Sequence, residues 1–115
     1  MKRNIRALPA LVLAGALTAC GAPDPNDENH VNGMDKAMAF TLCKKNAERQ
    51  LAAPATAKWQ NVTSAEISKS DDGQQWGIRT HVDSDNALGA TLRADVWCTV
   101  RPSDKDNAQV EAILL

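Results

Sequence analysis

The spacing of apolar residues changes along the chain, and each change predicts a different kind of structure. Residues 7–19 form an uncharged and mostly apolar run, whereas residues 20–33 are polar and rich in turn-formers. From Met34 to about Leu51, apolar residues recur every three to four positions, which is helical spacing. Beyond Pro54 they recur at every second position, as in half-buried strands. The chain therefore predicts one helix followed by a small sheet.

The helical stretch has one apolar side, and its positions recur four residues apart at Ala39, Cys43, Ala47 and Leu51. The charged residues of this stretch fall mostly on the opposite side. Asn32 or Gly33 is expected to cap the start, and Pro54 ends the pattern. We expect one amphipathic helix at the N-terminal end of the folded domain.

Two stretches alternate clearly enough to predict strands. Apolar or small residues predicted to face the core are Trp76, Ile78, Thr80 and Val82 in one strand, and Leu92, Ala94, Val96, Cys98 and Val100 in the other. Weaker patterns predict a first strand over 59–68 and a last one over 109–115, with turns near 71–73, 83–89 and 102–107. We expect an α+β fold, with the helix packed on an antiparallel sheet of three or four strands.

The N-terminus has the features of a secretory signal peptide. Three basic residues and no acid stand in the first six positions, followed by an apolar run of 13 residues. This run is too short for a transmembrane helix, which needs about 20 residues. Leu17-Thr18-Ala19-Cys20 resembles the lipobox of bacterial lipoproteins, in which the cysteine is acylated and becomes the new N-terminus.

This resemblance predicts a signal peptide over 1–19 and a lipid on Cys20. The alternative is an ordinary signal peptide whose nearby cysteine enters the fold. Removal of residues 1–19 takes away three of the 13 Lys and Arg and none of the 14 acids, leaving a net charge of −4. Such a chain has no electrostatic footprint for nucleic acid, and it gains no attraction to anionic headgroups. The membrane is therefore a partner through the lipid alone.

Three segments follow from these patterns: the signal peptide, a lipid-anchored flexible tether over 20–33, and an α+β domain over 34–115. We expect the domain on the extracytoplasmic side of the cell envelope. Gly21 follows Cys20, so the aspartate associated with inner-membrane retention is absent. In a Gram-negative host this favours the outer membrane.

Cys43 lies on the apolar side of the helix, and Cys98 lies on the apolar side of the clearest strand. Both face the same core, and the compartment beyond the membrane is oxidising, so we predict a disulfide between them. The alternative is a pair of buried free thiols.

Three short motifs also carry a resemblance to a known family. They are Pro54-Ala55-Thr56-Ala57-Lys58-Trp59, Val82-Asp83 and Asn86-Ala87-Leu88-Gly89-Ala90, together with Arg93 and the two cysteines. The chain from about 39 to 115 resembles a small domain of uncharacterised bacterial secreted proteins and lipoproteins, some of them phage-encoded. Ala55 and Leu88 depart from its pattern. The resemblance implies the helix-plus-sheet fold and the disulfide, and it implies no activity.

The stretch from Asp83 to Gly89 begins like a calcium-binding loop, but Leu88 and Ala94 stand where glycine and a bidentate glutamate are required. We therefore interpret it as a hairpin connection in which Gly89 takes a positive φ. His30 and His81 are the only histidines, and neither is placed for a zinc site or a catalytic triad. We expect no metal, no cofactor and no catalytic residues.

The residues most indicative of binding share the polar side of the strands. These are Trp97, Arg93, Arg79 and His81. Tryptophan and arginine are enriched in interface hot spots. The alternative is that Trp97 simply lies beneath a loop or the last strand.

We interpret the chain as a non-enzymatic binding or structural module of the envelope, with an envelope protein or the cell wall as its partner. One alternative is a phage or prophage lipoprotein that modifies the host surface, for example by blocking superinfection. The other is an envelope enzyme, which would need a pocket with converging polar groups.

Overall fold

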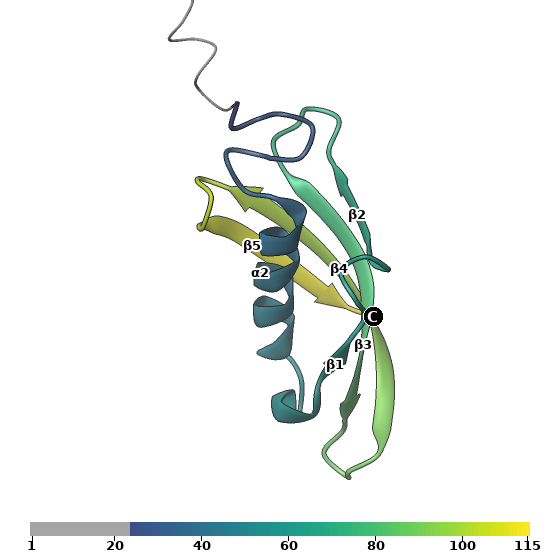
Figure 1. Cartoon of the computed structure of the whole chain (residues 1–115). Coiled ribbons are helices and arrows are strands. Elements are labelled where there is room, and N and C mark those ends of the chain that lie inside the picture. Colours follow the sequence, from purple (N-terminus) through teal and green to yellow (C-terminus); the bar gives the residue numbers. More distant parts are fainter. Residues whose placement is uncertain (1–23) are drawn as a thin grey trace, which may run out of the picture.

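A computed structural model describes residues 24–115, so the predicted signal peptide and Cys20 lie outside the described residues. The elements follow in the order α2 (Lys36–Glu48), the 3₁₀ turn η1 (Pro54–Thr56), β1 (Lys58–Trp59), β2 (Glu66–Lys69), β3 (Trp76–Asp85), β4 (Thr91–Pro102) and β5 (Ala108–Leu114). The helix lies against one face of a single antiparallel sheet (Figure 1).

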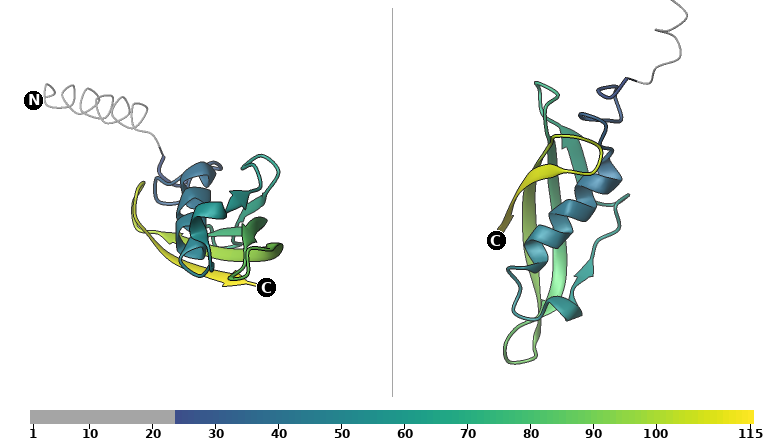
Figure 2. Two further views of the ribbon diagram at one scale, coloured as in Figure 1. Left: turned by 90° about the horizontal axis from the view of Figure 1, so that it is seen from below. Right: turned by 90° about the vertical axis from the view of Figure 1, so that its left-hand side faces the viewer.

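The sheet has the strand order β1-β3-β4-β5, and β2 pairs with β3 on the same edge as β1. Lys58 and Trp59 pair with the C-terminal part of β3, whereas β2 pairs with its N-terminal part. The long hairpin of β3 and β4 forms the centre of the sheet, and β5 lies along the free side of β4 (Figure 2). The α+β architecture agrees with the sequence prediction.

Two details of that prediction are wrong. The sheet has five strands instead of three or four. The extra strand arises because the expected strand over 59–68 is interrupted by a turn at Asn61. The main-chain oxygen of Asn61 accepts hydrogen bonds from the N–H groups of Ser64 and Ala65, at 2.9 and 3.0 Å. Its side-chain oxygen accepts from the N–H of Thr63 at 3.0 Å.

The helix is also not the N-terminal element of the fold, because residues 24–35 precede it and pack onto the domain. Val31 and Met34 are fully buried, and their main chains are hydrogen bonded to each other at 2.9 Å. The indole Nε1 of Trp76 donates to the main-chain oxygen of Met34 at 3.1 Å. We call residues 24–35 the N-terminal collar. The predicted tether over 20–33 therefore does not hold from residue 24 onwards.

The collar also changes the start of the helix. Asn32 and Gly33 have φ angles of 47° and 89°, so they form a turn and do not cap the helix. Asp35 is the N-cap, and its side-chain oxygen accepts a hydrogen bond from the N–H of Met38 at 2.9 Å. The helix, Lys36–Glu48, is shorter at both ends than the predicted span of 34–51.

The core lies between α2 and the inner face of β3 and β4. The predicted disulfide joins Cys43 to Cys98, with Cα atoms 5.9 Å apart. The alternation along β3 is confirmed, and its inner residues Trp76, Ile78, Thr80 and Val82 are buried. Leu92 was expected to face the core but is 58% exposed. Leu92 is the second residue of β4, and the end of the β3–β4 hairpin projects beyond the last turn of α2 (Figure 1).

Candidate functional site on the outer sheet face

The sheet face opposite α2 is called the outer face, and strand register arranges its side chains in rows across the strands. One row consists of Glu66, Arg79, Trp97 and Ile113. The next row consists of Ser68, Gly77, Thr99 and Glu111. These two rows cross four consecutive strands, β2 to β5.

Arg79 and Trp97 are stacked at the centre of the first row. The guanidinium carbon of Arg79 lies 4.3 Å from the centre of the Trp97 ring. The hairpin closes with a hydrogen bond from the N–H of Asn86 to the oxygen of Ala90. The alternation of an antiparallel ladder then makes Arg79 and Trp97 a non-hydrogen-bonded pair, in which facing side chains are closest.

This stack is accessible to solvent. Trp97 is 45% exposed and neighbouring Ile113 is 48% exposed, so the last strand flanks the indole without covering it. Within residues 24–115, the guanidinium of Arg79 forms neither an ion pair nor a hydrogen bond. Its N–H groups are therefore available to a ligand, while the indole holds the guanidinium plane in position.

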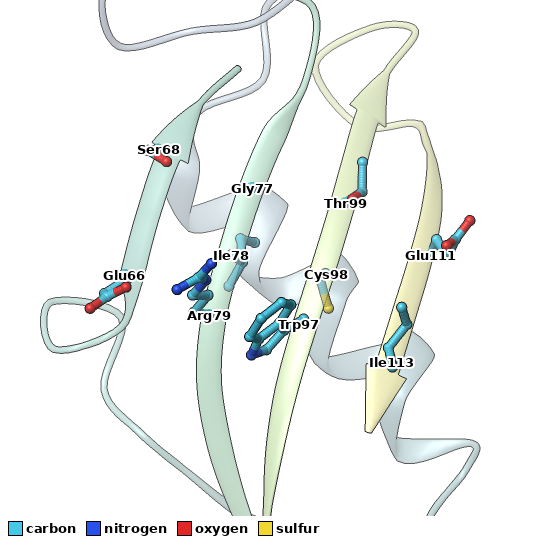
Figure 3. Close-up of a pocket in the computed structure, with 10 residues that line it drawn as sticks. All are labelled: Glu66, Ser68, Gly77, Ile78, Arg79, Trp97, Cys98, Thr99, Glu111 and Ile113. Atoms are coloured by element: carbon cyan, nitrogen blue, oxygen red, sulfur yellow. The ribbon is translucent and has the colours of Figure 1, made fainter. Parts of the chain in front are cut away.

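A shallow hollow of about 410 Å³ lies over these two rows, and we call it the outer hollow (Figure 3). Its wall is formed by the Arg79–Trp97 stack and Ile113, and Gly77 contributes no side chain to its floor. A second hollow of about 300 Å³ adjoins it, shares Thr99 and Glu111, and is lined also by Arg101. The outer hollow crosses β2 to β5, and the second hollow continues it along β4 and β5.

Arg93 was predicted as part of the same patch, but it lies outside the outer hollow. Its Nε and a terminal nitrogen donate to the two carboxylate oxygens of Asp83, at 2.7 and 3.0 Å. This bidentate hydrogen bonding from Arg93 holds the pKa of Asp83 below its usual value, and it raises the pKa of Arg93. The charge of Arg93 is therefore already compensated within the hairpin.

His81 is likewise not part of the outer hollow. It is half-buried on the outer face, opposite Asp95 and one row beyond the Arg79–Trp97 pair. Of the four predicted residues, the structure thus brings Arg79 and Trp97 together and separates Arg93 and His81 from them.

Sequence reasoning missed Gly77, Arg101 and Ile113 as members of this site. Gly77 and Arg101 have the same parity as Arg79 and Trp97, so alternation alone places them on the same face. The strand register, which puts Gly77 beside Thr99 and Trp97 beside Ile113, cannot be read from one sequence.

The loop between β3 and β4 is a hairpin turn, as interpreted. Gly89 has a φ of 86°, and the side-chain oxygen of Asn86 accepts from the N–H groups of Leu88 and Ala90 at 2.9 and 3.0 Å. Within residues 24–115 no group of three or more His, Cys, Asp or Glu side chains is placed to hold a metal ion.

The predicted lipidation site, Cys20, lies outside the described residues. In the described part of the chain no helix is long and apolar enough to span a membrane. No protein-family model, curated protein or solved structure matches the chain.

Proposed function

We propose that this protein is a lipid-anchored module of the bacterial envelope that binds an envelope protein or cell-wall partner through the outer face of its sheet. The observation that carries the binding role is the Arg79–Trp97 stack, exposed above the outer hollow. An exposed indole with an arginine against it combines large contact area with unused hydrogen-bond donors, as interface hot spots do. Anchoring rests on the lipobox-like sequence that ends at Cys20.

The anchor is tested by the mass of the mature protein. Acylation predicts a chain that begins at Cys20 and is heavier than its polypeptide by the acyl groups. Replacement Cys20→Ser is expected to leave an unlipidated chain that retains residues 1–19, so its mass should lack the acyl groups and include the signal peptide. An unmodified Cys20 in the native protein would refute the anchoring.

The binding role is tested by photocrosslinking in intact cells. A photoreactive residue at position 113 lies beside Trp97, and one at Lys45 on α2 serves as the matched control on the opposite side of the domain. The proposal predicts a discrete crosslinked product from position 113 that disappears with Trp97→Ala and Arg79→Ala. Thermal unfolding of these variants must stay near that of the wild type, because both side chains lie outside the core. Crosslinking from Lys45 with none from position 113 would contradict the assignment of the face.

A further inference from the structure

We infer that the outer hollow and its neighbour form one trench for an extended peptide, with a carboxylate side chain of that peptide seated over Gly77 between Arg79 and Arg101. This rests on the proposed binding role of the outer face and specifies the chemistry of the partner. Two features support this inference. Gly77 leaves a position without a side chain in a central strand, and Arg79 and Arg101, which form no ion pairs in the described part of the chain, lie on either side of it.

Gly77 is the first observation. It lies inside β3, the central strand, and glycine weakens a strand interior unless a bulge, a bend or a close approach requires it. Its φ is not positive, and an added Cβ would meet only the oxygen of Ser68, at 3.8 Å, which is an ordinary contact. The fold therefore does not require glycine here, and its one consequence on this face is an open floor.

The second observation is the pair of arginines. Arg79 follows Gly77 by two positions on β3, and Arg101 follows Thr99, the partner of Gly77, by two positions on β4. Because β3 and β4 are antiparallel, the two guanidiniums stand on opposite sides of the Gly77–Thr99 row. The rows that carry them are about 13 Å apart along the strands, which is wide enough for one extended chain.

Neither arginine is neutralised by an ion pair within residues 24–115. Arg79 is held by the indole of Trp97, and a terminal nitrogen of Arg101 donates to the neutral side-chain oxygen of Gln75 at 2.8 Å. Glu66 faces Arg79 across the strands, and the charge of Arg101 contributes to lowering the pKa of Asp72, but neither acid forms an ion pair with the arginine. The direct contacts of both guanidiniums are therefore with neutral groups, which leave N–H donors unused. A carboxylate is the anion whose planar geometry matches such donors.

The remaining lining indicates a peptide and not an isolated anion. Trp97 and Ile113 form an apolar wall beside the floor, where an apolar side chain next to the carboxylate would pack. Glu66 and Glu111 lie on β2 and β5, at the two ends of the trench, where their carboxylates are placed to accept hydrogen bonds from N–H groups or a basic side chain of the bound peptide. A uniformly anionic polymer would meet repulsion at both ends.

The experiment uses the full-length lipidated protein in detergent and two acetylated, amidated hexapeptides, Ala-Glu-Leu-Ala-Glu-Ala and the same peptide with Gln for Glu. Calorimetric titration at low salt is expected to show that the Glu peptide binds. The affinity of the Gln peptide should be lower by about tenfold or more, because hydrogen bonds to charged groups are lost. Added salt should weaken the binding of the Glu peptide and leave the binding of the Gln peptide unchanged.

Gly77→Val is the decisive variant, because it fills the floor with a residue that strands favour and leaves both arginines in place. This variant should fold at least as stably as the wild type, and its affinity for the Glu peptide should fall by about tenfold or more. The matched control is His81→Val, on the same face of the same strand but outside the trench, and it should bind the peptide as the wild type does.

Three outcomes would overturn the inference: equal affinity for the two peptides, no binding of either, or wild-type binding by Gly77→Val. Tighter binding to phosphatidylglycerol vesicles or to oligogalacturonate than to the Glu peptide would overturn the choice of a peptide. The crosslinking at position 113 does not depend on these titrations. A crosslinked partner in cells together with no carboxylate preference would leave the binding face intact and reject only this chemistry.

Discussion

Cys43 of α2 and Cys98 of β4 form a disulfide across a sequence separation of 55, with Cα atoms 5.9 Å apart. Cys98 directly follows Trp97, and side chains alternate along a strand. The bond therefore fixes β4 to the helix from the inner side at the position where its outer side carries the indole. Trp97 of the candidate binding surface and Cys98 of the disulfide are therefore adjacent residues of β4.

Removal of this disulfide should lower stability strongly. On the chain-entropy model, a closed loop of 55 residues stabilises the folded state by about 4 kcal/mol. The double variant Cys43→Ala, Cys98→Ala should lose about that much free energy of unfolding, measured by urea denaturation. Reductant should shift the wild type towards the variant and leave the variant unchanged. An unchanged urea midpoint would show that the bond contributes no net stability.

The N-terminal collar depends on the hydrogen bond from Trp76 to the oxygen of Met34. Trp76→Phe keeps an aromatic ring in the core but removes the donor, and a lost hydrogen bond of this kind costs about 1 kcal/mol. Hydrogen exchange should become faster at Val31 and Met34, whose main chains pair with each other. Exchange within β4 should change less, and uniform acceleration throughout the domain would argue against local loosening.

Two glycines should respond in opposite ways to alanine. Gly89 has a φ of 86°, a conformation that L-residues adopt at a cost of about 1 kcal/mol or more. Gly89→Ala should therefore lower the melting temperature. Gly77→Ala has ordinary strand geometry and only an ordinary contact, so it should leave the melting temperature unchanged or raise it. Equal destabilisation by both would mean that Gly77 is required by the fold.

The Arg93–Asp83 pair predicts a defined response to acid. Hydrogen bonding from Arg93 lowers the pKa of Asp83 in the folded state, below the unfolded value of about 3.9. The folded state therefore favours the ionised carboxyl, and this contribution is present above about pH 4. It is lost as the pH falls through the lowered folded pKa.

Asp83→Asn should accordingly show a shallower loss of melting temperature below about pH 4 than the wild type. Arg93→Gln should produce the same shallower profile, because it removes the group that lowers the pKa. The double variant should add nothing further. Profiles that stay parallel to the wild type would show that this pair does not couple to folding.

Local patterns were sufficient for the elements whose faces differ in polarity. The alternation in β3 and β4 correctly placed Ile78 and Val82 in the core, and it placed Arg79 and Trp97 outside. The helix and the disulfide followed because Cys43 and Cys98 both lie on apolar sides. In these elements burial follows directly from the period of the sequence.

The parts that were missed depend on contacts between distant residues. The collar contains only two buried apolar side chains, Val31 and Met34, among acids, asparagines and a proline, so its composition resembled that of a flexible segment. Its order comes from contacts with Trp76 and with the oxygen of Pro102, which accepts a hydrogen bond from the side chain of Asn32 at 2.9 Å. The trench required the register that sets Gly77 between two arginines.

The collar also limits how far the domain can travel from a bilayer. With Cys20 acylated, as proposed, four peptide units join the lipid-bearing residue to Asp24, where the described fold begins. Fully extended, they span at most about 14 Å. This short linker would hold the domain close to the bilayer surface, so the domain would sample only a thin layer of the envelope. Whatever occupies the trench would have to reside within that layer or extend into it.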